Sequence, residues 1–139
     1  MEAGSAQVFQ YPLLYLTGHG NILFSDAEAS NLRTYLESGG FLLADDNYGL
    51  NAYIVREIKK LFPDNPLVEI PFSHPIYHQQ WAFPNGIPKI HAHDNKPAQA
   101  FGIFIDGRLA VMLTYQADLG DGWEDRSVHN NPEELRAKA

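Results

Sequence analysis

The sequence predicts an α/β domain in which a mainly parallel sheet is flanked by helices, and three observations support this fold class. Two short apolar runs, at residues 11–16 and 41–44, are typical of strands that are buried on both faces. Each run is followed by an amphipathic helical pattern, which is the order expected for parallel strands joined by crossover helices. An Asp-Gly pair at 106–107 lies between two β-rich runs and predicts a late antiparallel hairpin.

Two helices are expected between the strands. Ser25 precedes Glu28 by three residues, which is the spacing of a capping box, so the first helix begins there. A Gly-Gly pair at 39–40 supplies the left-handed conformation that ends this helix. The second helix spans residues 50–62, because apolar residues share one face and a proline follows.

The second half of the chain contains shorter elements. Residues 67–70 predict a third strand, and residues 71–97 predict an ordered loop because this segment holds five of the nine prolines. Residues 101–105 and 108–115 form the two arms of the predicted hairpin. A further helix is expected to begin at Pro132, since proline suits the first helical position.

Length and composition predict one domain over residues 11–139, after a disordered or tag-like N-terminus at 1–10. The chain has 139 residues, of which 45% are hydrophobic and 19% charged, as in ordinary globular domains. A net charge of −7 with scattered basic residues argues against a nucleic-acid surface. The absence of cysteine excludes disulfides, thiolate metal ligands and every cysteine nucleophile. No apolar run approaches the roughly 20 residues of a membrane helix, so we expect a soluble chain without membrane insertion.

Two polar clusters follow the first two predicted strands. In an open α/β sheet, ligands bind beyond the carboxyl ends of the strands, where helix N-termini converge. If these strands are neighbours, His19 lies near Asp45 or Asp46, and a carboxylate orients a histidine and makes it more basic. The alternative is structural, because aspartates at such turns often cap helices and glycines shape a Gly-His-Gly loop. The candidate ligand-binding residues are Thr17, His19, Asn21, Asp45, Asp46, Asn47 and Tyr48.

Histidine pairs indicate a second kind of candidate site, a divalent metal centre. His74 and His78 are four residues apart and share one face if the segment turns once as a helix. A Zn²⁺ site needs a third ligand, and the glutamate that follows the first histidine in metalloproteases is missing. His91 and His93 would share one face of an extended segment, although loop histidines usually bond to backbone or water. The candidate ligands for Zn²⁺ or Mn²⁺ are His19, His74, His78 and Asp45 or Asp46.

Other enzyme classes lack their motifs in this sequence. No serine lies in a G-x-S-x-G elbow and no glycine-rich phosphate loop follows a strand, which argues against a serine hydrolase and a nucleotide-binding domain. Aromatic residues in or beside loops could stack on a sugar ring. We expect them to be buried under the loops instead, because aromatics supply much of a small core's hydrophobic gain. These residues are Trp81, Phe83, Tyr115 and Trp123.

Three motifs together resemble a known family: TGHG after the first strand, GGFLLADD across the second, and DGRLAV in the hairpin. Over residues 9–139 the chain is similar to the DUF4159 family of bacterial proteins of unknown function. That family resembles class I glutamine amidotransferase-like domains and, more distantly, the trehalose-utilisation (ThuA-like) group. The resemblance implies a flavodoxin-like sheet and a periplasmic or exported location.

The sequence departs from what these relatives carry. The nucleophilic cysteine of an amidotransferase follows the strand after the amphipathic helix, where this chain has Ala44, Asp45 and Asp46. Glutamine hydrolysis through a thioester is therefore excluded for this chain. Family members usually have a strand-helix unit before Tyr11 and a strand after Ala139. We therefore expect a partial domain, truncated at both ends, whose open sheet edge invites pairing with a second copy as a homo-oligomer.

The leading hypothesis is an amidotransferase-like domain without its nucleophile that binds a polar small molecule at the carboxyl ends of the strands. Its basis is the position of the candidate residues together with the missing cysteine. Two alternatives stay open at this point: a metal-dependent hydrolase that uses histidine and aspartate, and a structural or interaction module whose polar turns are only caps. The sequence does not decide whether the protein is an enzyme, and the cofactor considered is a divalent metal.

Overall fold

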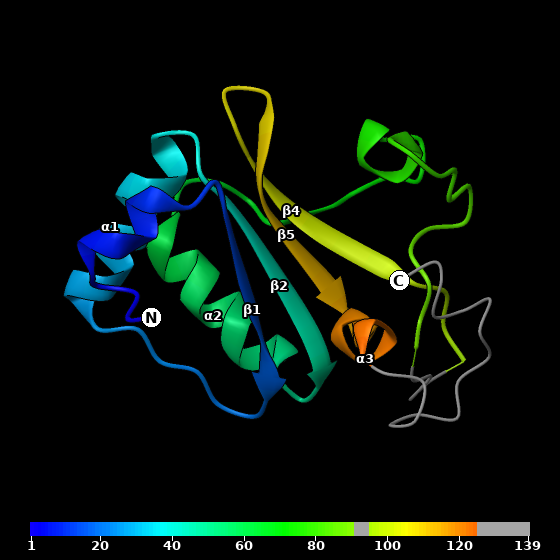
Figure 1. The fold of residues 1–139 in the computed structure, drawn as a ribbon, viewed down its shortest axis with the longest axis horizontal. Coiled ribbons are helices and arrows are strands. Elements are labelled where there is room, and N and C mark those ends of the chain that lie inside the picture. The colour runs from blue at the N-terminus through cyan, green and yellow to red at the C-terminus, as the bar shows by residue number, and fades with distance from the viewer. Residues whose placement is uncertain (91–94, 125–139) are drawn as a thin grey trace.

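A computed structural model describes residues 1–90 and 95–124, and it has a mixed α/β fold (Figure 1). The elements in chain order are η1 (Ala6–Gln10), β1 (Leu13–His19), α1 (Asp26–Glu37), β2 (Phe41–Tyr48), α2 (Asn51–Leu61), β3 (Val68–Glu69), η2 (Pro75–His78), β4 (Gln99–Ile105), β5 (Arg108–Tyr115) and α3 (Leu119–Trp123). The five strands form one open sheet in the order β1-β2-β5-β4-β3.

The sheet is mixed, so the prediction of a mainly parallel sheet is not confirmed. β1, β2 and β5 are parallel neighbours, whereas β4 runs antiparallel to both β5 and β3. The predicted hairpin is present, because β4 and β5 pair around the turn at 106–107. The third parallel strand beside β2 is β5, not the segment at 67–70. That segment supplies only β3, whose two residues are exposed at the far edge of the sheet. A strand of this length cannot form the buried centre of the sheet.

Helices α1 and α2 pack on one face of the sheet, and a loop covers part of the other (Figure 1). Apolar side chains of α1 and α2 form the larger core cluster with the alternate residues Leu42 and Ala44 of β2. A smaller cluster around Ile70 and Tyr77 packs against Met112 on the other side. Strands β2 and β5 therefore have buried or partly buried residues on both faces, in the period-two pattern of a strand. In β1 alternate residues are exposed, so the expectation that the run at 11–16 is buried on both faces is wrong.

Helix α1 begins and ends as expected from the sequence. The Ser25 hydroxyl accepts a hydrogen bond from Glu28 N–H (3.2 Å), and the Glu28 carboxylate accepts one from Ser25 N–H (2.8 Å), which is a complete capping box. After the helix, Gly39 adopts a positive φ of 111°. Gly40 is needed for a different reason, because a Cβ there would lie 2.3 Å from the ring of Tyr35.

Residues 45–48 were expected to form a polar turn, and they instead continue strand β2. The ladder with β1 extends through the pair of Gly18 and Asp46, and Asp45 also pairs with Thr114 of β5. Both aspartates are completely buried. The strand accommodates them because each carboxylate receives several hydrogen bonds, which offset the cost of burying a charge.

The N-terminal residues 1–10, which we expected to be disordered or tag-like, include helix η1. Val8 is 1% exposed within the main core, and the Asn31 side chain donates hydrogen bonds to the carbonyls of Ala3 (2.8 Å) and Ser5 (3.0 Å). The helix expected from Pro132 lies outside the described residues. Among the helices described, none has the length and apolar character that crossing a membrane requires.

Candidate functional site

The parallel strands β1, β2 and β5 end at the same rim of the sheet, next to α3 (Figure 1). The register pairs Gly18 with Asp46 and His19 with Tyr48, so both polar clusters identified in the sequence lie at this rim. The two aspartate side chains do not point to the same face of the sheet, however. Successive residues of a strand point to opposite faces, and this separates Asp45 from Asp46.

Asp45 is the centre of a hydrogen-bond cluster on the face away from α1 and α2. Its Oδ1 accepts from the Thr114 hydroxyl (2.6 Å), and its Oδ2 accepts from the Tyr15 hydroxyl (3.0 Å) and from Gly120 N–H (3.0 Å). These partners come from β5, β1 and α3, so one carboxylate joins three elements to β2. We call Tyr15, Thr17, Asp45, Asn47, Thr114 and Gly120 the Asp45 cluster.

Asp46 lies on the same face of β2 as Ala44, toward the helices. Its Oδ1 accepts a hydrogen bond from Leu50 N–H (2.9 Å), and its Oδ2 accepts one from Gln116 N–H (3.3 Å). Leu50 is the N-cap residue of α2 and makes no side-chain cap of its own. Asp46 therefore satisfies the first donors of α2, where a negative charge is favourable. This is the capping role that the sequence left open as the structural alternative.

Burial alters the ionisation of two groups at the rim. The pKa of Asp46 is raised because burial disfavours its charged form, although backbone hydrogen bonds from Leu50, Gln116 and Asn51 act in the opposite direction. Burial also raises the pKa of the Tyr15 phenol to about 12, and the nearby charge of Asp45 acts in the same sense. Tyr15 is therefore a hydrogen-bond donor to Asp45 throughout the neutral pH range.

The exposed part of the rim is formed by the other predicted residues. The Thr17 hydroxyl donates to Asn47 Oδ1 (2.6 Å) and lies 3.0 Å from the Asp45 carbonyl oxygen, a second acceptor. Thr17 and His19 are exposed, Tyr48 is 54% exposed, and Asn47 is half-buried. Within the described part of the chain, no hydrogen bond engages the Asn47 amide nitrogen. These groups could contact a ligand, whereas the two carboxylates beneath them are occupied.

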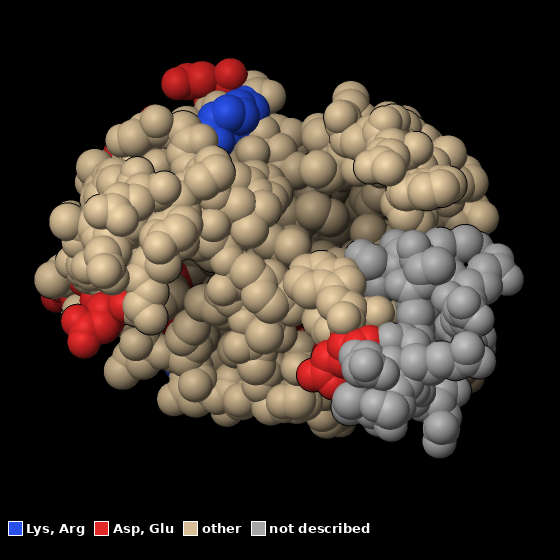
Figure 2. Space-filling view, viewed as in Figure 1, with Lys and Arg blue, Asp and Glu red and all other residues tan. Residues whose placement is uncertain are grey.

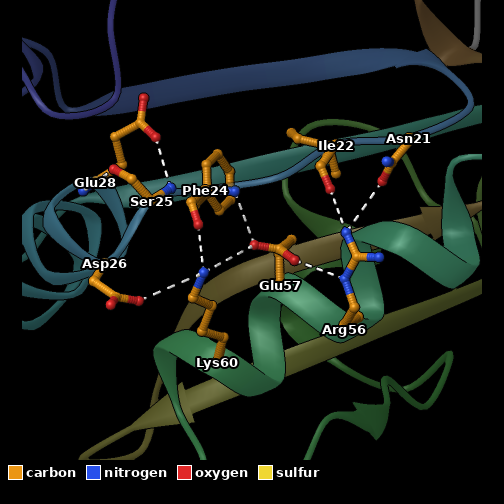
Figure 3. Close-up of polar contacts among 9 residues, drawn as sticks. All are labelled: Asn21, Ile22, Phe24, Ser25, Asp26, Glu28, Arg56, Glu57 and Lys60. Carbon is orange, nitrogen blue, oxygen red and sulfur yellow. Dashed lines mark hydrogen bonds and ion pairs between the residues drawn. The ribbon is translucent and has the colours of Figure 1, made fainter.

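The remaining candidate, Asn21, belongs to a different network that joins the loop after β1 to α2 (Figure 3). Its Oδ1 accepts from Arg56 (3.1 Å), and the same guanidinium donates to the buried Glu57 (2.7 Å). Glu57 also accepts from Phe24 N–H (2.9 Å), and the Lys60 ammonium lies 3.8 Å from it. Burial alone would raise the pKa of Glu57, but the bonds from Phe24 and Arg56 outweigh it and lower that pKa.

The candidate metal ligands are dispersed over the molecule. His74 Nδ1 accepts from Ile76 N–H (3.1 Å), and its ring packs edge-on against Phe104 (5.6 Å between centroids). Phe104 pairs with Leu109 near the start of β5, so His74 lies at the rim opposite to Asp45. His78 Nε2 donates to the Phe72 carbonyl (2.8 Å).

A metal centre built from these residues is therefore not assembled. Within residues 1–90 and 95–124, no three side chains of the metal-binding types are grouped so that they could hold an ion. His91 and His93 lie outside the described residues.

The two tryptophans are exposed, so the expectation that loops bury them is wrong. Trp81 is 67% exposed, and Trp123 is 53% exposed at the end of α3. Phe83 is partly buried against the smaller core cluster, as expected, and Tyr115 is also partly buried. The ring of Trp123 contacts that of Tyr15 at 5.1 Å between centroids, which places an aromatic pair beside the Asp45 cluster.

Several residues of the rim were missed by sequence reasoning. Tyr15, Thr114 and Gly120 provide the partners of Asp45, and the turn between β5 and α3 carries two non-glycine residues in the left-handed region, Gln116 (φ 47°) and Asp118 (φ 51°). Asp46 holds one end of this turn and Asp45 the other. A lone threonine directly after the apolar run 109–113 was the available signal, since a polar residue at a buried strand position needs a partner.

The chain was compared with known proteins. Residues 1–139 match the family model described as Domain of unknown function (DUF4159). The comparison with curated proteins gives no match. The family match covers every element of the fold and the rim, and its description assigns no activity.

Proposed function

The chain belongs to the DUF4159 family, and we propose that it is a binding domain for a polar small molecule held at the carboxyl rim of β1, β2 and β5. The observation that supports this most is the layered construction of the rim. Thr17, His19 and Tyr48 are exposed and Asn47 is half-buried at this rim, and two buried aspartates fix the strand ends beneath it. Ligands of open α/β sheets bind at this edge.

The strained turn after β5 supports the same location. Gln116 and Asp118 both have positive φ, a conformation that costs of the order of 1–3 kcal/mol for each non-glycine residue. Such strain persists where the surroundings hold it, and here the two aspartates do so through Gln116 N–H and Gly120 N–H. Strained backbone is concentrated at ligand-binding sites, which is why we place the ligand beside this turn.

The chemistry of the rim restricts the class of ligand. Thr17 and Asn47 offer hydroxyl and amide groups, and the nearest ionisable partners beneath them are carboxyls. Figure 2 shows an acidic patch at the position of α3, and among the described residues drawn there no basic side chain adjoins it. A neutral or cationic polar molecule suits this surface better than an anion does.

We also propose the finer fold relationship to flavodoxin-like, class I glutamine amidotransferase-like domains. Its support is the order β1-α1-β2-α2, with parallel β1 and β2 and a candidate site beyond their carboxyl ends. Without cysteine, a relative of this kind would keep the scaffold and not the thioester chemistry.

A thermal-shift experiment tests the proposed function. The protein is melted with a panel of sugars, amino acids, amides and amines, because a ligand that binds only the folded state raises the melting temperature. At least one compound should stabilise the wild type and not Asn47→Ala. The matched control is Asn85→Ala, an exposed asparagine in the loop after η2, which should respond like the wild type.

Two results would contradict the proposal. The first is a panel in which no compound raises the melting temperature. The second is a compound whose effect is the same in Asn47→Ala as in Asn85→Ala. Either result would favour the remaining alternative, a structural module in which Asp45 and Asp46 only join elements.

A further inference from the structure

We infer that the ligand of this rim is a carbohydrate, with a pyranose ring stacked on the aromatic pair Tyr15 and Trp123 and its hydroxyls bound by Asn47 and Thr17. This inference rests on the proposed function and specifies its ligand class. It is carried by the aromatic pair, which lies on the sheet face next to Thr17 and Asn47 of the rim and keeps a large part of its surface exposed.

The aromatic pair is held in place by the Asp45 cluster. The Tyr15 hydroxyl is anchored on Asp45 Oδ2 (3.0 Å), which orients the phenol ring on the exposed face of β1. Gly120 brings α3 against this hydroxyl, since a Cβ at position 120 would lie 2.6 Å from the Tyr15 oxygen. Trp123 follows one turn later in α3, and its ring lies 5.1 Å from that of Tyr15 at an angle of 50°.

Exposure of these rings has a cost that a ligand would remove. Trp123 is 53% exposed and Tyr15 is 37% exposed, although aromatic side chains provide the largest hydrophobic gain when they are covered. A pyranose presents a flat face of C–H groups that can cover such rings, while its hydroxyls remain directed outward in the ring plane. An aliphatic ligand would cover the rings equally well but would leave the polar groups beside them without partners.

Polar partners lie beside the rings on the same face. Thr17 is two residues after Tyr15 on β1, a separation of about 7 Å along the strand, and Asn47 is bonded to Thr17. The Asn47 amide nitrogen is a donor and the Thr17 hydroxyl oxygen keeps acceptor capacity, so the pair matches the donor-acceptor character of a sugar hydroxyl. Asp45 is not a direct ligand, because Tyr15, Thr114 and Gly120 occupy its carboxylate; it is a positioning residue.

The test uses the two tryptophans of the chain as reporter and control. In a Trp81→Phe protein, Trp123 is the only tryptophan. Its fluorescence should shift to shorter wavelength and saturate on titration with methyl glucosides, maltose or cellobiose. Sorbitol carries similar hydroxyls without a ring and should cause no such shift. The 67% exposed Trp81 makes Trp81→Ala the matched control, and it should bind with wild-type affinity by calorimetry.

Variants at position 123 complete the test. Trp123→Ala should weaken the binding of the responsive glycoside by at least about tenfold, a loss of about 1.4 kcal/mol, and Trp123→Phe should retain more affinity because it keeps a ring. Circular dichroism checks that both variants fold. Equal affinity of Trp123→Ala and wild type, or equal binding of sorbitol, would overturn the inference.

The two proposals fail differently. If an amine or amide stabilises the protein through Asn47 and no pyranoside binds, the carbohydrate inference is wrong and the proposed function stands. If neither pyranosides nor the wider panel bind, both are wrong.

Discussion

Among single residues, Asp46 and Glu57 show how burial can have opposite consequences for a carboxyl group. Burial is the largest influence on both. At Asp46 it prevails and the pKa is raised, whereas at Glu57 the hydrogen bonds from Phe24 and Arg56 and the charge of Lys60 prevail and the pKa is lowered. The difference follows from the donors, because Glu57 is bonded to a cation and Asp46 accepts from backbone N–H groups alone.

These shifts predict opposite pH dependences of stability. A raised pKa in the folded state stabilises the protein below the unfolded pKa, and this contribution is lost as pH rises through the folded pKa. A lowered pKa stabilises above the unfolded pKa, and the contribution is lost as pH falls through the folded pKa. From about pH 3 to about pH 7, a span that includes ordinary carboxyl pKa values, wild type should therefore lose stability relative to Asp46→Asn and gain it relative to Glu57→Gln.

Urea unfolding at the two pH values measures these differences. The comparison with each variant cancels the titration of all other groups that the substitution leaves unchanged. The free-energy difference between wild type and variant should change with pH in opposite directions for Asp46→Asn and Glu57→Gln. A change in the same direction for both would contradict the assigned directions of the two pKa shifts.

The sequence predicted that polar residues gather at one rim of the sheet, but it did not predict which side chains form hydrogen bonds there. Asp45 and Asp46 were candidates because they follow an apolar run. The hypothesis required that their strand and the strand of Thr17 be neighbours, and β1 and β2 do pair. Their separate roles depend on strand register, since a difference of one position reverses the face of a side chain. The partners Tyr15 and Thr114 are 30 and 69 residues away from Asp45 along the chain, and no local pattern encodes such contacts.

At the scale of elements, α3 is attached to the sheet through Gly120. This glycine donates its N–H to Asp45 Oδ2 (3.0 Å) and leaves room for the Tyr15 hydroxyl. A methyl group at position 120 would lie 2.6 Å from that hydroxyl oxygen, so the helix or the tyrosine must move. Gly120→Ala should therefore destabilise the protein by about 1–3 kcal/mol, the usual cost of overpacking.

A double-mutant cycle with Tyr15→Phe checks this origin. Removing the hydroxyl removes the clash, so Gly120→Ala should cost clearly less in the Tyr15→Phe background than in the wild type, as measured by urea unfolding. Additive effects of the two substitutions would show that the cost of Gly120→Ala arises elsewhere, for example in the conformational preference of α3 itself.

The elements also show why sequence patterns predicted some parts of the fold better than others. The capping box of α1 and the Asp-Gly hairpin are determined by a few neighbouring residues, and both are present. The position of β5 beside β2 depends on which of the later segments is best suited to burial at the centre of the sheet. Residues 108–115 are apolar enough to be buried in the sheet centre, whereas Val68 and Glu69 are exposed at its edge. Strand order therefore depends on the whole set of strands rather than on one of them.

At the scale of the whole molecule, the sheet separates histidines that the sequence suggested could meet. His19 lies at the carboxyl ends of the parallel strands, and His74 packs on Phe104 near the opposite rim. Both acidic candidates of the proposed metal set are occupied: Asp46 is bonded to Leu50 and Gln116, and Asp45 is bonded within the Asp45 cluster. A Zn²⁺ site needs three or four ligands at about 2.0–2.2 Å from one ion, and this arrangement cannot provide them without moving a strand end.

We therefore expect that these residues bind no stoichiometric metal. Elemental analysis of protein purified without chelator should find less than one equivalent of zinc or manganese, and EDTA should leave the melting temperature unchanged. His19→Ala and His74→Ala serve as matched variants, because they remove one imidazole from each rim. One equivalent of metal in the wild type that is lost in either variant would contradict the expectation, because it would require His19 or His74 to reach an ion through a rearrangement of the rims. A metal-assisted hydrolase would then replace the binding domain as the function to test.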